Sequence, residues 1–198
     1  MTPRILETAA DWRADDVAHA DDWTLALSEK DIAELDAALA HAKAKGGDLL
    51  DVTKDDFPLP SLRARLRELE QDLIDGRGFC LIRGLPVERY ADDDASLIYW
   101  GIGMHLGRPW PQNKHGHLLG DVTDQGKSGA DPTSRGNEIG GVAFPYHSDG
   151  SDLVGLMCLR KAKSGGVSTV ANAVAIHNEL VRIRPDLAAL LYEPQPYD

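Results

Sequence analysis

Phe144-Pro-Tyr-His-Ser-Asp-Gly-Ser-Asp152 leads into the apolar run Leu153-Val-Gly-Leu-Met-Cys-Leu159. A short apolar run bounded by turn residues is typical of a buried strand. In extended backbone, the side chains of residues i and i+2 project from the same face. His147 and Asp149 can therefore converge on one metal ion, as two of the three ligands in the two-His-one-carboxylate site of non-haem Fe(II) oxygenases. The third ligand has to come from elsewhere.

The pattern His-x-Asp/Glu occurs three times, whereas 7 His and 32 Asp+Glu among 198 residues predict about one match by chance. His19-Ala-Asp21 lies in an acidic leader, before any expected strand. His177-Asn-Glu179 lies in a segment with helical periodicity, where residues i and i+2 point about 200° apart. Only the His147 match combines extended backbone with a following apolar strand, so it is the predicted metal site.

The composition favours one domain with a substantial core, because 42% of the 198 residues are apolar. The formal net charge is -11, and residues 1–60 carry 14 acidic against 6 basic residues. No basic stripe is present that would neutralise phosphates. The charge therefore argues against nucleic acids and anionic membranes as partners.

Cys80 and Cys158 each lie within an apolar run, which predicts two buried thiols in a reducing compartment. The N-terminus, Met-Thr-Pro-Arg-Ile-Leu-Glu7, lacks the apolar core of a signal peptide. The longest apolar run, residues 153–159, is too short to span a bilayer. Together these features predict a cytoplasmic protein.

Four segments have apolar residues at helical spacing and end at Gly or Pro, which predicts helices at 28–46, 61–76, 92–107 and 175–184. Four shorter apolar runs predict strands at 78–83, 118–122, 153–159 and 168–174. Residues 125–137 are rich in Gly, Ser, Asp and Pro, and we expect a mobile loop there, either a lid over substrate or simply a disordered segment.

Helices that precede strands predict an α+β, mainly β architecture with N-terminal helices. We expect an acidic helical leader at 1–60 and a sheet region at 61–198, within one structural domain overall. Four strands are fewer than a barrel or sandwich normally has. The sheet is therefore expected to be unfinished at Asp198.

Four segments resemble the taurine dioxygenase-like (TauD/TfdA) superfamily of Fe(II)- and 2-oxoglutarate-dependent oxygenases. They are Gly78-Phe-Cys-Leu-Ile-Arg-Gly84, Leu106-Gly-Arg-Pro-Trp-Pro-Gln-Asn113, His147-Ser-Asp-Gly-Ser-Asp152 and Leu156-Met-Cys-Leu-Arg-Lys-Ala-Lys-Ser-Gly-Gly-Val-Ser-Thr169. Their order and spacing fit the N-terminal two-thirds of that family, from about residue 60 to 192.

The resemblance implies a double-stranded β-helix (jelly roll) and a dioxygenase that uses Fe(II), 2-oxoglutarate and O₂ to hydroxylate a small molecule. It implies that His147 and Asp149 are iron ligands. Ser168, with its neighbour Thr169, falls where the family's hydroxyl residue binds a carboxylate of 2-oxoglutarate. Candidate substrate contacts, in a loop near the family's active-site mouth, are Gln112 and Asn113.

Two departures from the family bear on activity. The family's distal histidine and its 2-oxoglutarate-binding arginine come later than Asp198. His177 resembles a helical position that is not a ligand, and Arg182 and Arg184 look like surface charges. We therefore expect a truncated chain with little turnover by itself. Lys161 stands where the family has a proline, which concerns the end of a strand and not the chemistry.

Two alternatives remain open. One is a non-catalytic fragment or pseudoenzyme whose incomplete sheet pairs with another chain, for instance in a homo-oligomer. The other is a cupin-like metalloprotein that uses His115 or His117 together with His147.

Overall fold

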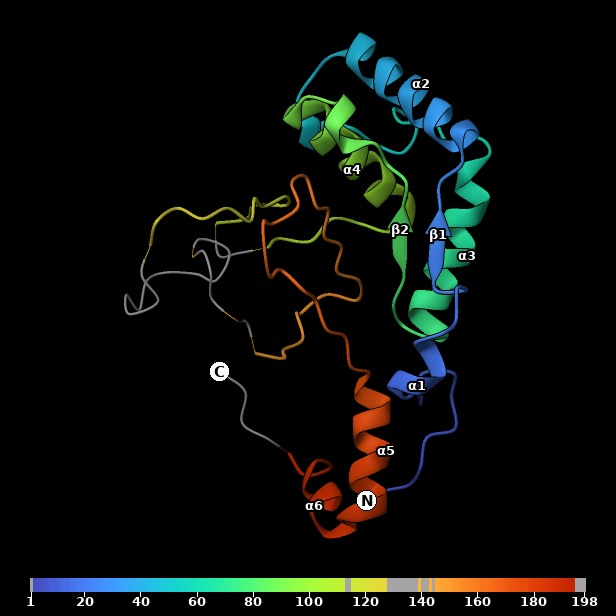
Figure 1. Ribbon diagram of the computed structural model, residues 1–198, viewed down its shortest axis with the longest axis vertical. Coiled ribbons are helices and arrows are strands. Elements are labelled where there is room, and N and C mark those ends of the chain that lie inside the picture. Colours follow the sequence, from blue (N-terminus) through green and yellow to red (C-terminus); the bar gives the residue numbers. More distant parts are fainter. Residues whose placement is uncertain (1, 113–114, 128–138, 140–142, 144, 195–198) are drawn as a thin grey trace.

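The computed structural model describes residues 2–112, 115–127, 139, 143 and 145–194. Helices dominate the described part, which also holds one pair of strands (Figure 1). The elements in chain order are α1 (Ala14–Val17), β1 (Thr24–Ala26), α2 (Glu29–Lys45), η1 (Leu49–Asp51), α3 (Leu62–Asp75), β2 (Leu81–Arg83), η2 (Val87–Arg89), α4 (Asp92–Leu106), α5 (Ala173–Ile183) and α6 (Pro185–Leu190).

The four predicted helices are confirmed, and α2 and α5 begin where a nearby side chain caps them. Ser28 caps α2: its hydroxyl accepts from the Asp31 amide, and the Asp31 carboxylate accepts from the Ser28 amide at 2.7 Å. The last predicted helix begins slightly earlier than expected, at α5, because the side chain of Asn172 accepts from the Val174 amide at 2.8 Å. Pro185 ends that helix and begins α6.

The start of α3 is capped by a residue from another helix. Ser61 occupies the N-cap position, but its hydroxyl makes no capping bond. Glu34 of α2 replaces it, accepting from the amides of Ser61 and Leu62 at 2.8 and 2.9 Å. The cap of α3 is therefore a tertiary contact that also ties the helix to α2.

The sheet is smaller than predicted. β1 and β2 pair in parallel, with Leu25 opposite Ile82, so the strand expected at 78–83 is confirmed in part. The strands expected at 118–122, 153–159 and 168–174 are absent from the described residues, and Ala173 already belongs to α5. An extended segment becomes a strand only when a neighbour pairs with its backbone, and no described segment does so here. The mainly β expectation is therefore wrong for the described part, and the jelly roll stays an expectation.

The core lies between α2, α3 and α4 and draws residues from both sides of residue 60. Leu35, Phe57, Leu62 and Ile98 are fully buried within it. The indole of Trp100 donates to the Val52 carbonyl at 2.9 Å, so a polar group within the core is also satisfied. The division of the chain at residue 60 stays a prediction.

The N-terminal residues bind α5 to the rest of the molecule (Figure 1). The amide side chain of Asn178, which is fully buried, accepts from the Leu6 amide and donates to the Leu6 carbonyl, both at 2.8 Å. Arg182 forms an ion pair with Asp11 at 3.0 Å. Further along, the indole of Trp12 donates to the Arg77 carbonyl at 2.9 Å, just beyond α3. Residues 6–12 thus bridge α5 and the end of α3.

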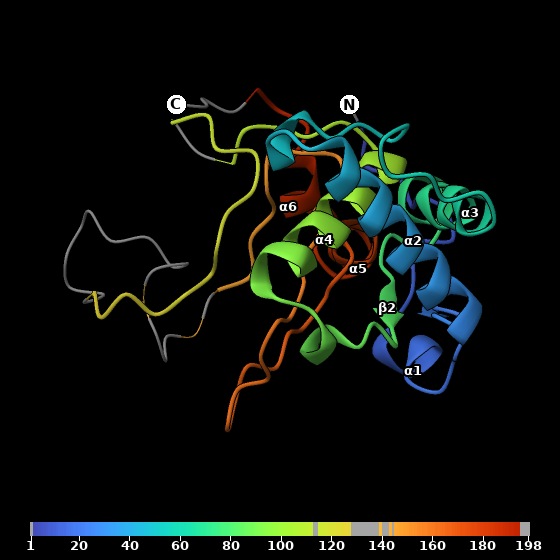
Figure 2. The same cartoon turned by 90° about the horizontal axis from the view of Figure 1, so that it is seen from above.

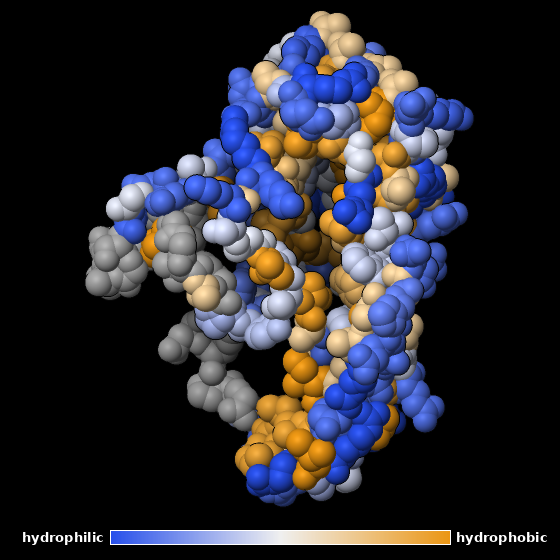
Figure 3. Space-filling model, in the orientation of Figure 1, coloured by the Kyte–Doolittle hydropathy of each residue, from blue (hydrophilic) through white to orange (hydrophobic). Residues whose placement is uncertain are grey.

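The segment between α4 and α5 carries apolar side chains in solvent. Figure 2 shows the part around residues 153–170 extending away from the helices. Leu156 and Val167 are 79% and 86% exposed. A second apolar area covers α5 and α6 in Figure 3, where Ile176, Ile183, Leu187, Leu190 and Leu191 are exposed.

The two cysteines differ from the expectation that both are buried. Cys80 is partly buried and Cys158 is exposed, and both thiols are free. Cys158 was expected inside a strand, but its segment pairs with no described neighbour and leaves the thiol in solvent. Among the helices of the described part, none is both long and apolar enough to cross a membrane.

Candidate metal site

His147 and Asp149 lie in a segment that is neither helix nor strand, and both residues are exposed. Nδ1 of His147 lies 2.9 Å from the carbonyl oxygen of Pro145. A carbonyl only accepts, so Nδ1 carries the proton in this contact, and the neutral imidazole has its lone pair on Nε2. A backbone carbonyl that orients the second nitrogen is a common feature of metal-bound histidines. The Pro145 carbonyl is therefore in a position to orient His147 as a ligand, and the sequence did not identify it.

The two predicted ligands meet no third ligand in the described part of the chain. No group of three or more His, Cys, Asp or Glu residues is arranged there to hold a metal ion. An imidazole nitrogen and a carboxylate oxygen suit Fe(II), so the donor types fit iron, while the described residues show no third donor beside them.

The same finding bears on the cupin-like alternative. The rings of His115 and His117 lie near one another, with centroids 6.0 Å apart. They form no three-residue group with His147 within the described residues. The structure therefore gives the cupin-like reading no support.

The predicted 2-oxoglutarate contacts follow a glycine turn. Gly165 and Gly166 have φ of 75° and 68°, a left-handed conformation that favours glycine, and the chain then continues to Ser168 and Thr169. Both hydroxyl residues are exposed, and neither side chain makes a hydrogen bond to another described residue. They are accessible, but the structure assigns them no ligand.

The predicted substrate contacts are described only in part, since Asn113 lies outside the described residues. Gln112 is exposed, and its side-chain amide donates to the Trp110 carbonyl at 2.9 Å. Its backbone amide donates to the His117 carbonyl at 2.6 Å. Gln112 therefore stabilises its own turn in this structure, the ordinary role of a polar residue in a Pro-rich loop.

Two residues that the sequence analysis did not assign to the site, His177 and Arg184, have structural partners. Nε2 of His177 lies 2.8 Å from the Tyr192 hydroxyl, which links α5 to the residues after α6. Arg184 pairs with Asp186 at 2.6 Å. The ion pair holds the pKa of Asp186 below its usual value and raises the pKa of Arg184.

Two contacts from α4 reach the segment that follows Asp149, and sequence reasoning missed both. A Cβ atom at Gly155 would lie 2.7 Å from the Tyr99 hydroxyl oxygen, so the backbone at Gly155 passes directly against Tyr99. Arg160 donates to both carboxylate oxygens of Asp92 at 2.9 Å. Nothing in the sequence linked Asp92 to Arg160, or Tyr99 to Gly155.

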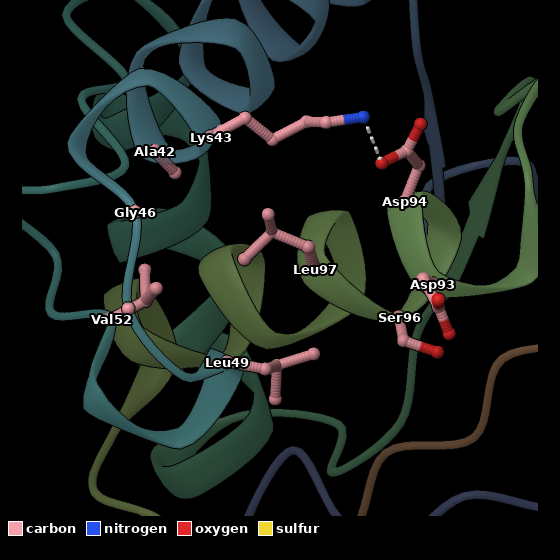
Figure 4. Close-up of a pocket in the computed structure, with 10 residues that line it drawn as sticks. Ala42, Lys43, Gly46, Leu49, Val52, Asp93, Asp94, Ser96 and Leu97 are labelled. Carbon is pink, nitrogen blue, oxygen red and sulfur yellow. Dashed lines mark hydrogen bonds and ion pairs between the residues drawn. The ribbon is translucent and has the colours of Figure 1, made fainter.

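A cavity of about 380 Å³ lies between the end of α2, η1 and the start of α4 (Figure 4). Leu49, Val52 and Leu97 give it an apolar wall, and the ammonium of Lys43 reaches across to the Asp94 carboxylate at 2.6 Å. None of the predicted site residues lines this cavity. It is therefore separate from the candidate metal site.

The chain belongs to the family described as "Taurine catabolism dioxygenase TauD, TfdA family", which residues 27–198 match. It is 31% identical over 182 residues to FR-33289 synthase of Streptomyces rubellomurinus (strain ATCC 31215), covering 91% of this chain and 53% of that protein. It is 29% identical over 193 residues to the taurine hydroxylase-like protein SAT17 of Stachybotrys chartarum (strain CBS 109288 / IBT 7711), covering 94% and 50%. The chain spans about half the length of these curated relatives.

The family match confirms the resemblance that the four sequence segments suggested. The family is one of oxygenase-type oxidoreductases, and its description names them dioxygenases.

Proposed function

We propose that this chain carries part of the active site of an Fe(II)- and 2-oxoglutarate-dependent dioxygenase, with His147 and Asp149 as two iron ligands. The reaction is hydroxylation of a C–H bond in a small molecule, with O₂ as oxidant, in the cytoplasm. One observation supports the proposal above the others: the match to a dioxygenase family runs through the segment that contains both residues.

The geometry at His147 supports its role as a ligand. Donation from Nδ1 to the Pro145 carbonyl, at 2.9 Å, favours the neutral tautomer whose Nε2 can bind a metal ion. The carboxylate of Asp149 adds a negative charge that suits a divalent cation. When bound, iron supplies the activation of O₂, coupled to conversion of 2-oxoglutarate to succinate and CO₂.

Other residues of the chain have binding roles in this proposal. The hydroxyl of Ser168 donates to a carboxylate of 2-oxoglutarate, with Thr169 beside it, and their exposure leaves both able to do so. Gln112 and Asn113 contact the substrate. For Gln112 this requires its amide to leave the Trp110 carbonyl, which it contacts at 2.9 Å.

The third iron ligand and the cation that pairs with 2-oxoglutarate come, in this proposal, from outside the described residues. A site with two protein ligands holds its metal more weakly than a complete facial triad. We therefore expect Fe(II) to bind weakly where His147 and Asp149 are its only protein ligands.

Anaerobic titration tests the assignment. Fe(II) and 2-oxoglutarate added together to the chain should give a weak visible charge-transfer band, and His147→Ala should abolish it. His41→Ala is the matched control, because His41 is exposed on α2 and takes no part in the proposed site. A band of equal strength in His147→Ala would overturn the assignment.

The exposed apolar segment supports a second candidate function. Val154 and Leu156 before the glycine turn, and Val167 and Val170 after it, are each more than half exposed. Unpaired extended backbone with apolar side chains favours association with another chain. The alternative is thus a non-catalytic protein that acts by oligomerisation or partner binding. An oligomer on gel filtration, without the Fe(II)–2-oxoglutarate band, would favour it, and a monomer that shows the band would exclude it.

A further inference from the structure

The backbone at Gly155 runs against the side chain of Tyr99. A Cβ atom added there would lie 2.7 Å from the Tyr99 hydroxyl oxygen, and 3.5 and 3.6 Å from two of its ring carbons. The first distance is shorter than any ordinary van der Waals contact, whereas the other two are normal. Glycine therefore lets the chain pass where any other residue would strike the hydroxyl.

The backbone that carries Tyr99 is fixed in the core. Its neighbours on α4, Ile98 and Trp100, are buried, at 0% and 6% exposure. The Tyr99 side chain is itself partly buried, and burial raises the pKa of its hydroxyl. A tyrosine ring has only two side-chain torsions, so few alternative positions are open to its hydroxyl.

A second contact holds the same segment five residues later. Arg160 donates to both carboxylate oxygens of Asp92, the first residue of α4. This ion pair is exposed, so it adds little to the free energy of unfolding. Its effect is on the direction in which the segment runs past α4. Tyr99 and Asp92 together define where residues 155–160 lie relative to α4.

The path from these contacts back to Asp149 is short. Gly155 follows Asp149 by six residues, and the Ser151 hydroxyl donates to the Leu153 carbonyl at 3.1 Å between them. That hydrogen bond restricts the turn which connects the anchored segment to the predicted ligands.

We propose that α4 is the platform for the predicted iron ligands, and that Tyr99 is a positioning residue which acts on His147 and Asp149 through Gly155. The inference rests on the proposed function. Tyr99 contacts neither metal nor substrate in this account. It limits the conformations of the segment and so reduces the entropy that metal binding has to overcome.

A double-mutant cycle tests the contact. Gly155→Ala adds the Cβ that strikes the Tyr99 hydroxyl, and Tyr99→Phe removes only that hydroxyl. In the double variant, the remaining distances to the ring, 3.5 and 3.6 Å, are ordinary contacts. Gly120→Ala is the matched control, since a Cβ at Gly120 meets nothing within 4 Å.

Two readouts separate positioning from a merely structural role. The first is the backbone order of residues 150–160 without metal, measured as NMR order parameters, and the second is the Kd for Co(II), followed by its visible absorption. Gly155→Ala should lower the order parameters and raise the Kd about tenfold, the scale of losing an outer-shell partner. The double variant should return to within about threefold of Tyr99→Phe, given the usual size of such couplings. The urea midpoint should stay unchanged.

The outcomes are distinguishable. Gly155→Ala with wild-type order parameters and Kd, or a double variant that is not rescued, overturns the role of Tyr99. A loss confined to the urea midpoint also overturns it, because that would be structural destabilisation only. If the wild-type chain binds no Co(II), the proposed function fails. Order parameters that fall in Gly155→Ala and return in the double variant still support the platform in that case.

Discussion

Replacing Gly101 by alanine should destabilise this protein, although alanine is the better helix former. Gly101 is buried on α4, where a Cβ atom would lie 2.3 Å from Cγ of Phe57 and 2.4 and 2.6 Å from its two Cδ atoms. Phe57 is fully buried. Nε2 of His105, on the same helix, lies 2.8 Å from the Phe57 carbonyl oxygen, so the ring is held at its backbone as well.

The expected magnitude follows from two opposing terms. Alanine in a helix interior is favoured over glycine by about 0.8–1 kcal/mol. Overpacking a core costs typically about 1–3 kcal/mol, and a clash with three carbons of a buried ring belongs at the upper end. The net loss in the free energy of unfolding should therefore be about 2 kcal/mol. For a chain of this size, that corresponds to a fall in Tm of roughly 4–8 °C.

Gly103→Ala is the matched control, because Gly103 lies on the same helix, is exposed, and would place its Cβ more than 4 Å from any neighbour. It should stabilise the chain by up to about 1 kcal/mol. Both variants gain the same helix propensity, so the difference between them in urea unfolding, followed by circular dichroism, measures the packing at Phe57. Equal stability of the two variants would refute the reasoning.

Two further predictions concern a titrating tyrosine and a buried amide. Burial, with the 2.7 Å hydrogen bond to Asp36, raises the pKa of Tyr90 to about 12, so the folded state keeps a proton that the unfolded state loses near pH 10. Stability should fall between pH 10 and 12 by at most about 2–3 kcal/mol, and Tyr90→Phe should lack that part of the fall in urea titrations at each pH. Asn178→Leu leaves both backbone groups of Leu6 without their partner and should cost about 2 kcal/mol, with faster exchange of the Leu6 amide; unchanged exchange there would contradict it.

The sequence predicted the helices well because their determinants are local. The capping box of α2 is complete within four residues, Ser28 to Asp31, and needs no tertiary information. Even so, the cap of α3 comes from Glu34, 27 residues before Ser61, and no local pattern reveals it. The same limit explains why three of the predicted strands are absent from the described residues. An apolar run shows that a segment is able to pair, but it does not show which segment would pair with it.

In the candidate site, too, the local pattern could be read from the sequence and the tertiary contacts could not. The spacing of His147 and Asp149 was readable, since ligand types two residues apart on extended backbone already point to a metal. The contacts that hold this segment could not be read from the sequence. The acceptor for Nδ1 is a backbone carbonyl, which carries no residue-type signal. The Asp92–Arg160 pair joins residues 68 apart, and the acidic triplet that begins α4 has a sufficient local explanation as helix capping.

The geometry of α4 explains how one helix serves both the core and the candidate site. Residues 92 and 99 are seven apart, so at 100° per residue their side chains point within about 20° of one another. Ile98 lies about 110° around the helix from that direction, Ile102 about 70° and Ala95 about 50°, all on the same side and all buried. Asp92 and Tyr99 therefore lie beside the buried face of α4, where they contact residues 155–160. We expect a substitution on the buried face of α4 to change the free energy of unfolding. A substitution that affects the contacts of Asp92 or Tyr99 should instead change the order of the segment that follows Asp149.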